Sequence, residues 1–484
     1  MTARLRDATL GLLPRQVARP AYDRAATRIG IVHFGPGAFH RAHQAFYADR
    51  MLAHDPGLAI SAVALRSDAV RAALAPQDGL YSLIEREAEP AVRVIGAIRE
   101  VLTAPATPQL VFARLADPAV RFVSATVTEK GYCLTPAGDL DVDHPQVRRD
   151  LADPARPTTL VGWLAEGLRR RRAGGAGGLI ALSCDNLSAN GERFRRAVLQ
   201  FAQARGDADL ARWIEAEVAF PDSMVDSITP ATDDALRAEA AEALGLADAW
   251  PIQRERFAQW VVGCELGADT STFAEAGVTL TGDVAAFERA KLRLLNGAHS
   301  TLAYAGLRLG HATVAEAMAD LPLAAFVERL MRQDIRASLT ATAGLDLDAY
   351  IDQVLGRFRN PAIVHRLSQI ALDGSQKLPF RLLETVAEAR ATGRPLERLC
   401  VGVAAWMLFV RDQARAGAAI VDPMADALVE IGLACDGDAV RDVERFLELA
   451  NVIPAALKGD RQFTGALARA YAKLDDDPAV AMSL

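Results

Sequence analysis

The spacing of hydrophobic residues changes near residue 283, and this change constrains the fold more than any other feature of the sequence. Before it, short apolar runs bounded by Gly, Asp or Pro alternate with helical patterns. The clearest of these runs are 28–34, 60–65, 121–126 and 179–184. Buried strands that alternate with helices predict a doubly wound, mostly parallel sheet.

After residue 283 the strand pattern ends. Ala, Leu, Glu and Arg recur at helical spacing over 284–309, 323–339, 378–390, 399–415 and 439–449. These repeats predict an all-α region. Because 484 residues are too many for one ordinary domain, we expect an α/β domain at 1–283 and a helical domain at 284–484.

Composition and charge exclude several classes of protein. The chain is 51% hydrophobic and 24% charged, which is typical of a packed globular protein. Its net charge of −7 argues against a nucleic-acid-binding surface, which needs clustered basic residues. The one basic run, 169–172, ends a predicted helix, where cations suit the helix dipole.

The compartment is predicted from cysteines and apolar segments. The five cysteines form no CxxC pair, which fits a reducing compartment and argues against a structural zinc site. The first 20 residues lack the pattern of a signal peptide. No uncharged apolar run reaches the roughly 18–20 residues of a membrane span. We therefore expect a cytoplasmic protein that is not membrane-bound.

The first predicted strand runs into a glycine-rich turn and then a helix. A strand, a GxG turn and a helix form the dinucleotide-binding arrangement of a Rossmann-type domain, in which the helix start stabilises the pyrophosphate. The complete motif has a third glycine, where this chain has His40. The segment predicted to bind the cofactor comprises Gly35, Pro36, Gly37, Ala38, Phe39, His40 and Arg41.

The end of the second strand bears on the choice of cofactor. A carboxylate such as Asp68 would bind the adenosine ribose of NAD, whereas Arg66 could meet the extra phosphate of NADP. Asp68 could equally be the N-cap of the helix that follows. Because both residue types are present, these residues alone do not choose between NAD and NADP.

Polar residues gather on one stretch of the first helix of the second half, FERAKLRLLNGAHS at 287–300. On an ideal α-helix, Glu288 lies about 60° and His299 about 80° around the axis from Lys291. Asn296 lies about 140° from Lys291. The alternative is an amphipathic surface helix with solvated charges.

These residue types suit the oxidation of an alcohol. Hydride transfer from a secondary alcohol requires a base that takes the hydroxyl proton, and Lys291 can serve if burial disfavours its charge. Amides such as that of Asn296 can stabilise the developing oxyanion without competing for the proton. A histidine such as His299 can hold a neighbouring hydroxyl.

A second group of polar residues follows two predicted strands. Asn186, in SCDN, and Asn190 come after the fourth strand, where ligands of doubly wound sheets bind. Asx-turns or helix caps are the alternative use of these residues. Glu129 and Lys130 follow the third strand. We place Glu129 with the cofactor and treat Lys130 as a rival base to Lys291.

The sequence resembles the long-chain mannitol dehydrogenase family, which includes mannitol 2-dehydrogenases, arabinitol dehydrogenases and fructuronate reductases (mannonate oxidoreductases). The resemblance covers nearly the whole chain. It rests on GPGAFHRAHQAFY at 35–47, TVTEKGY at 126–132, SCDN at 183–186, FPDSMVDSITP at 220–230, KLRLLNGAHS at 291–300 and HRLSQIALDGSQKLPFR at 365–381. Several long motifs in order are far more specific than any one of them.

The resemblance assigns roles to individual residues. It implies that Lys291 is the general base, that Asn186 and Asn296 stabilise the oxyanion, and that His299 orients the substrate. Further residues that it places near the substrate are Asn190, Asp226 and Glu288. It also implies that no metal takes part and that the protein is a monomer or weak homodimer. The family usually has arginine after the aspartate of 225–228, where this chain has Ser227.

The segment 365–381 looks most like the fructuronate reductase branch. It supplies His365, Lys377 and Arg381 as candidate partners of a substrate carboxylate. We therefore expect NAD-dependent interconversion of D-mannonate and D-fructuronate. The alternatives are oxidation of mannitol to fructose or of another polyol such as arabinitol, and a catalytically silent sugar-binding protein on the same fold.

Overall fold

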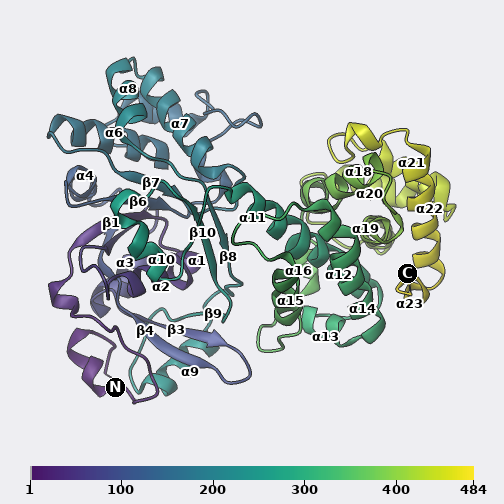
Figure 1. Ribbon diagram of the computed structural model, residues 1–484, viewed down its shortest axis with the longest axis horizontal. Coiled ribbons are helices and arrows are strands. Elements are labelled where there is room, and N and C mark those ends of the chain that lie inside the picture. Colours follow the sequence, from purple (N-terminus) through teal and green to yellow (C-terminus); the bar gives the residue numbers. More distant parts are fainter. Residues whose placement is uncertain (1–2, 484) are drawn as a thin grey trace. The chain divides into compact units, whose positions relative to one another are not determined.

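The computed structural model describes residues 3–483. The chain divides into two compact units, Met1–Ala285 and Ala286–Leu484 (Figure 1). The division lies close to residue 283, where the hydrophobic pattern changes. An α/β domain and a helical domain follow each other along the chain, as predicted.

The first unit is built on a five-stranded parallel sheet with the strand order β5-β2-β1-β6-β7. Its strands are β1 (Ile29–Phe34), β2 (Ala59–Ala64), β5 (Ile98–Thr103), β6 (Phe122–Ala125) and β7 (Ile180–Ser183). All four predicted strands are present. The fifth, β5, was not predicted, because at this edge of the sheet Arg99 and Glu100 interrupt the apolar run.

Helices cover both faces of this sheet (Figure 1). Val32 and Phe34 of β1 pack on one side with Phe112 of α4 and Trp163 of α6. Ile31 packs on the other side with the helices α2, α3 and α10. The helices of this unit are α1 (Ala38–Ala42), α2 (Gln44–Met51), α3 (Ala69–Leu74), α4 (Pro108–Ala116), α5 (Pro145–Ala152), α6 (Leu160–Ala173), α7 (Asn190–Ala204), α8 (Ala208–Glu217), α9 (Asp234–Leu244) and α10 (Thr270–Glu275).

Two small sheets extend the first unit, and neither was predicted. In one, β3 (Tyr81–Arg86) pairs antiparallel with β4 (Ala91–Ile95) and parallel with β9 (Ile252–Glu255). In the other, β10 (Gln259–Gly263) pairs antiparallel with β8 (Ser223–Asp226) and parallel with β11 (Thr279–Thr281). These strands are short, and their partners are distant in the sequence.

The second unit is helical throughout its described residues. Its long central helix α19 is largely buried and packs against α12, α20 and α22. The helices from the domain boundary onward are α11 (Val284–Ala290), α12 (Ala298–Arg308), α13 (Val314–Ala319), α14 (Leu321–Arg329), α15 (Leu347–Phe358), α16 (Leu367–Ile370), α17 (Gly374–Leu378), α18 (Glu384–Ala391), α19 (Glu397–Arg415), α20 (Ala425–Ala434), α21 (Ala439–Leu447), α22 (Arg461–Asp476) and α23 (Pro478–Ala481). Within residues 3–483, none of the helices has the length and apolar character needed to cross a membrane.

Three stretches of the helical unit are π-helical, which pattern analysis did not predict. They are Lys291–Gly297, Leu330–Ile335 and Pro379–Leu383. In a π-helix the backbone hydrogen bond joins residues five apart, and such turns occur frequently at functional sites. The first stretch joins α11 to α12 and contains the motif that drew attention in the sequence.

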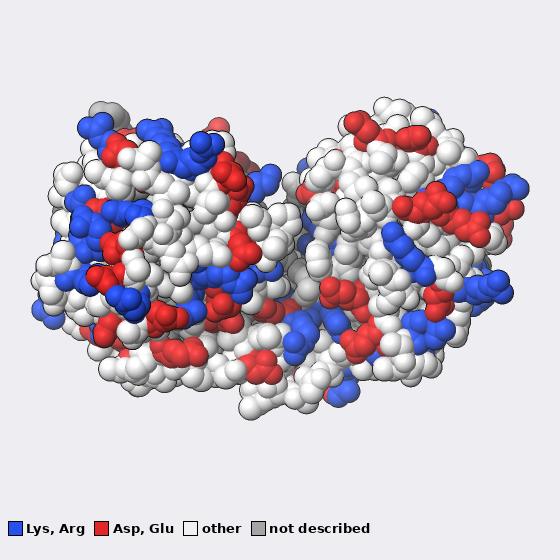
Figure 2. Space-filling view, turned by 90° about the horizontal axis from the view of Figure 1, so that it is seen from above, with Lys and Arg blue, Asp and Glu red and all other residues white. Residues whose placement is uncertain are grey.

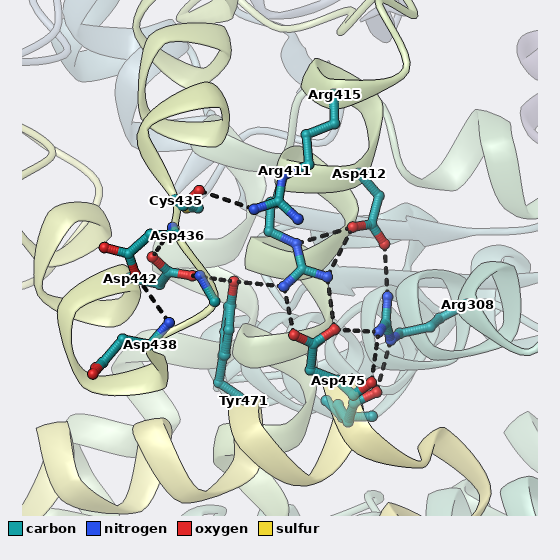
Figure 3. Close-up of polar contacts among 12 residues, drawn as sticks. Arg308, Arg411, Asp412, Arg415, Cys435, Asp436, Asp438, Asp442, Tyr471 and Asp475 are labelled. Carbon is teal, nitrogen blue, oxygen red and sulfur yellow. Dashed lines mark hydrogen bonds and ion pairs between the residues drawn. The ribbon is translucent and has the colours of Figure 1, made fainter.

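A network of ion pairs joins α12, α19 and α22 (Figure 3). Arg411 of α19 donates both guanidinium ends to Asp475 of α22, at 2.6 and 2.7 Å. Arg308 of α12 donates to the same carboxylate at 2.8 Å. Beside it, Asp442 accepts hydrogen bonds from the Gly437 backbone, from the Asp436 backbone and from the Tyr471 hydroxyl. The network ties the ends of three helices together.

The surface shows no separation of charge on the face that Figure 2 presents. There, Lys and Arg side chains are interspersed with Asp and Glu side chains on both units. All five cysteines are free thiols, and only Cys264 among them is exposed.

Candidate active site

The turn after β1 has the shape that a dinucleotide needs. Gly35 has φ +86°, and a Cβ added there would overlap the carbonyl oxygen of Thr126. Gly37 begins α1, and a Cβ on it would meet nothing closer than 3.9 Å. The first glycine therefore allows the sharp turn, and the second leaves the backbone open to a ligand, so these residues fit the pyrophosphate of NAD.

Two residues after this turn do not face a cofactor, contrary to the sequence prediction. His40 and Arg41 are each 1% exposed. The His40 ring stacks on His33 of β1, with 3.4 Å between ring centroids. Arg41 donates to the carbonyl of Trp250 at 2.6 Å. Helix α1 thus packs on the sheet through stacked histidine rings, at the position where the complete motif has a third glycine.

Both stacked histidines are neutral. Burial lowers the pKa of His33 to about 3 and holds the pKa of His40 well below its usual value. The His33 ring lies within hydrogen-bonding distance of the hydroxyls of Ser124 and Thr126, at 2.8 and 3.0 Å. It therefore links β1 to the start of the loop after β6.

Asp68 lies at the N-cap position of α3 but makes no capping hydrogen bond. Its carboxylate accepts two bonds from Arg71, at 2.7 and 2.8 Å, and one from the Thr103 hydroxyl at 2.5 Å. The hydrogen bonds from Arg71 hold the pKa of Asp68 below its usual value. Arg66 is exposed on the same segment. The ionised Asp68 keeps its predicted place beyond the end of β2, and its contact with the ribose stays a prediction.

The loop after β6 is strained and is held from the loop after β7. Thr128 has φ 66° and ψ 164°, a region that residues other than glycine avoid at a cost of about 1–3 kcal/mol. Asp185 accepts hydrogen bonds from the backbone of Val127 and Thr128, at 3.0 and 2.8 Å. Glu129 and Lys130 follow and are exposed. Lys130 is therefore solvated, whereas Lys291 is buried.

The two asparagines after β7 have different roles. Asn186 is exposed beyond the end of the strand, as expected for a ligand-binding residue. Asn190 is fully buried. Its amide donates to the carbonyls of Ser183, Asp185 and Ser223 and accepts from the Ser223 backbone. The prediction that Asn190 binds substrate is therefore wrong, because its side chain anchors β7 to β8.

Asp226 is the last residue of β8 and is buried. It pairs with Gln259 in the neighbouring strand β10. The next residue, Ser227, donates its hydroxyl to the carbonyl of Phe257 at 2.9 Å. The serine that replaces the family's usual arginine is thus used in a bond to the backbone of the 255–259 turn.

In the helical unit, the geometry of 291–297 differs from the α-helix that was expected. Because this stretch is π-helical, Lys291 and Asn296 lie one turn apart and near the same face. The predicted separation of about 140° is wrong. Lys291 is 9% exposed, while Asn296 and Glu288 are partly exposed. The π-turn therefore brings the candidate base and one candidate oxyanion donor together.

His299 lies on α12, and its ring packs against the rings of two other residues. It stacks on Phe358, with 4.9 Å between ring centroids, and meets His365 edge to face at 4.6 Å. Nε2 of His299 and Nδ1 of His365 are buried and have no hydrogen-bond partner in residues 3–483. Burial, together with the nearby cations, holds the pKa of His299 well below its usual value. The structure thus places two neutral histidines side by side, each with a buried ring nitrogen that lacks a hydrogen-bond partner among residues 3–483.

Arg381 and Lys377 lie in the same region of this unit. Arg381 donates to the Ser300 hydroxyl at 3.2 Å, next to His299 in the chain. Lys377 donates to the carbonyl of Leu372 at 2.6 Å. Burial lowers the pKa of Lys377 and of Arg381. Neither cation forms an ion pair with any residue that the structure describes. The predicted residues His299, His365, Lys377 and Arg381 are therefore brought together.

Known families account for both units. A model of the mannitol dehydrogenase Rossmann domain matches residues 29–271, and a model of the mannitol dehydrogenase C-terminal domain matches residues 283–475. The chain belongs to the mannitol dehydrogenase family. Members of this family are NAD-dependent oxidoreductases of polyols and sugar acids, and the predicted fold class, enzyme class and cofactor are confirmed.

Relatives in the mannitol dehydrogenase family divide between two substrate classes. The D-mannonate oxidoreductase of Escherichia coli is 38% identical, over 95% of this chain and 96% of the relative. A mannitol 2-dehydrogenase of Pyrenophora tritici-repentis is 37% identical, over 99% of this chain and 86% of the relative. The structure of Pseudomonas fluorescens mannitol 2-dehydrogenase with NAD and D-mannitol matches at TM-score 0.82 and 36% identity, covering 99% of this chain and 98% of that one.

One candidate residue of this mannitol dehydrogenase family member escaped the sequence analysis. Asp185 was given no role of its own in the sequence, yet it joins the loops after β6 and β7. Its partners, Val127, Thr128 and Tyr132, are more than 50 residues away in the sequence. The only indication of this role in the sequence was that the SCDN and TVTEKGY motifs each follow a predicted strand.

Proposed function

We propose that this protein interconverts D-mannonate and D-fructuronate by hydride transfer at C2, with Lys291 as the general base. A sugar acid carries a carboxylate, and a polyol does not. The observation that carries the choice is the group of Arg381, Lys377 and His365 beside His299. Arg381 and Lys377 form no ion pair among the described residues, so a substrate carboxylate can pair with them. Asp373 and Asp422 act on Lys377 only from beyond ion-pair distance.

Removal of the hydroxyl proton falls to Lys291. A buried amine gives up its own proton more readily than one in water, and this side chain is 9% exposed. In its neutral form it accepts the proton of the C2 hydroxyl as the hydride leaves. In the reverse direction it returns that proton to the oxygen of the ketone.

Neutral donors complete the site. The amides of Asn186 and Asn296 hold the C2 oxygen as it gains negative charge, and they offer no acidic proton that would quench the base. His299 and His365 orient neighbouring hydroxyls through their available ring nitrogens. Asp226 and Glu288 are proposed as further hydroxyl partners.

The turn at 35–39 would hold the pyrophosphate of NAD, and Asp68 and Glu129 would hold its two ends. Bound NAD supplies the acceptor for the hydride. The task of the protein is to fix the C2 carbon against that acceptor and to exclude water from the reacting atoms.

The second candidate is mannitol oxidation, since mannitol 2-dehydrogenases are as similar to this chain as the D-mannonate oxidoreductase is. One assay separates the candidates: the purified protein is mixed with NADH and either fructuronate or fructose. We expect NADH absorbance to fall with fructuronate. A fall with fructose alone overturns the proposal in favour of the polyol reaction. No fall with either ketose, or with a wider panel of ketoses, indicates a silent protein.

A further inference from the structure

Three residues of the loop 126–132 are hydrogen-bonded to a single side chain, that of Asp185. Within the loop, Thr128 has a backbone conformation that suits only glycine. The Asp185 carboxylate accepts from the Thr128 backbone through one oxygen, and from the Val127 backbone and the Tyr132 hydroxyl through the other. We propose that Asp185 is a positioning residue that holds this strained loop in the shape needed to bind the nicotinamide half of the cofactor.

Tyr132 makes the clamp rigid. It is fully buried, and its hydroxyl also lies 2.6 Å from the Ser183 hydroxyl, at the end of β7. Burial and the nearby Asp185 hold the pKa of Tyr132 well above its usual value. The tyrosine therefore remains a hydrogen-bond donor, and the Asp185 carboxylate accepts a hydrogen bond from each of its three partners.

The position of the loop links the clamp to the cofactor. Strands β6 and β7 are neighbours, and Ala125 pairs with Ser183 at their carboxyl ends. Ligands of doubly wound sheets bind beyond these ends. Thr126, at the start of the loop, donates its hydroxyl to the carbonyl of Gly35 at 2.6 Å. The loop thus lies between the glycine turn and the β7 segment that carries Asn186.

This arrangement predicts a selective defect. The adenosine half of the cofactor depends on the glycine turn and on the end of β2, which Asp185 does not touch. ADP-ribose contains that half and the pyrophosphate but lacks nicotinamide. In Asp185→Ala we expect the Kd of NADH to rise about tenfold, in keeping with the strain at Thr128, and the Kd of ADP-ribose to change less than about twofold. NADH fluorescence and calorimetry with ADP-ribose measure the two constants without any sugar substrate.

A second substitution separates positioning from simple loss of stability. Glycine adopts the backbone conformation of residue 128 without strain, so Thr128→Gly removes the need for a clamp. We expect the double variant Asp185→Ala/Thr128→Gly to recover NADH binding to within about threefold of the wild type. A side chain that merely stabilised the fold would not be replaced by a glycine in another loop.

The chain offers a matched control in the helical unit. Like Asp185, Asp442 accepts hydrogen bonds from two backbone N–H groups and one tyrosine hydroxyl (Figure 3). Unlike Asp185, it also accepts one from Arg445. Asp442→Ala should lower the Tm and leave the Kd of NADH unchanged. The proposal is overturned if Asp185→Ala binds NADH as the wild type does, if it loses ADP-ribose equally, or if Thr128→Gly restores nothing. These outcomes do not depend on which sugar the enzyme reduces.

Discussion

Gly297 lies directly against the backbone of Arg381. A Cβ added to Gly297 would lie 2.6 Å from the Arg381 carbonyl oxygen, closer than such atoms approach in proteins. The contact joins the π-helical stretch 291–297 to the π-helical stretch 379–383. The segment of the candidate base and that of the candidate carboxylate partner therefore approach closely at a point where residue 297 has no side chain.

Gly297→Ala should separate these two segments. The added methyl meets backbone, which cannot move aside cheaply, so Arg381 shifts relative to Ser300 and His299. We expect the KM of the ketose to rise severalfold and the Tm to fall, because overpacking costs about 1–3 kcal/mol. Gly356→Ala, in α15 with nothing within 4 Å of the new atom, is the control and should keep a wild-type KM. If the two variants had the same KM and Tm, the contact between Gly297 and Arg381 would not be what positions Arg381.

Lys291→Ala tests the base. We expect turnover to fall by about a hundredfold or more, as for the loss of a general base, while the Kd of NADH stays close to the wild-type value. Stopped-flow absorbance and NADH fluorescence measure the two quantities. Arg289→Ala removes an exposed cation from the preceding turn and should retain activity. Near-normal turnover in Lys291→Ala would contradict this assignment and make Lys130 the next candidate for the general base.

Arg381→Gln tests recognition of a carboxylate. The neutral amide keeps a donor for Ser300 but loses the charge, so we expect the KM of fructuronate to rise at least about tenfold. The corresponding change for fructose, which has no carboxylate, should be small. Arg359→Gln, an exposed arginine paired with Glu328, is the control. A variant that loses both ketoses equally would mean that Arg381 supports the fold of the site and does not select the acid.

Glu166 predicts a pH dependence of stability. Burial alone would raise its pKa, but hydrogen bonds from Arg169, Arg170 and Arg205 outweigh burial and lower the pKa from 4.5 to about 2. A carboxyl whose pKa is depressed in the folded state stabilises the protein above pH 4.5, and this contribution is lost as the pH falls toward 2. It amounts to about 3 kcal/mol at neutral pH.

Glu166→Gln should therefore unfold at lower urea than the wild type at pH 7, and the gap should close between pH 5 and pH 2. Urea unfolding at a series of pH values checks this. Asp209→Asn removes the exposed partner of Arg212 and should change little at any pH. A gap that stays constant with pH would show that the ion pairs do not account for it.

The same cluster explains the basic run 169–172, which the sequence analysis assigned to the helix dipole. Arg169 and Arg170 donate to Glu166 one turn earlier, at 2.8–2.9 Å. Arg171 is buried and donates to the carbonyls of Asp117 and Gly177. Three of its four arginines are thus bonded within the first unit, although only Arg171 is buried.

Much of the fold followed from the hydrophobic pattern because buried central strands and long helices leave clear periodic signals. The edge strand β5 did not, because the consecutive Arg99 and Glu100 interrupt its apolar run. The orientation of His40 could not be predicted either, since it depends on His33 in a different element. Asn190 was misassigned because an asparagine after a strand suits a ligand and a structural bond equally well.

The candidate site was predicted in part for a similar reason. Lys291, His299, Lys377 and Arg381 belong to long ordered motifs, and each is present in the helical unit with a suitable environment. The predicted angle between Lys291 and Asn296 was wrong because an α-helix was assumed for 291–297. Nothing in the composition of that stretch distinguishes a π-helix from an α-helix.

The π-helical register of 291–297 has a consequence for how this protein tolerates deletions in its sequence. An α-helix through the same seven residues would be locally more stable, and it would turn Asn296 away from Lys291. Shortening this stretch by one residue could therefore leave a well-folded protein with its chemical groups out of alignment. In this helix, the local stability of the backbone and the alignment of the chemical groups are therefore separate requirements.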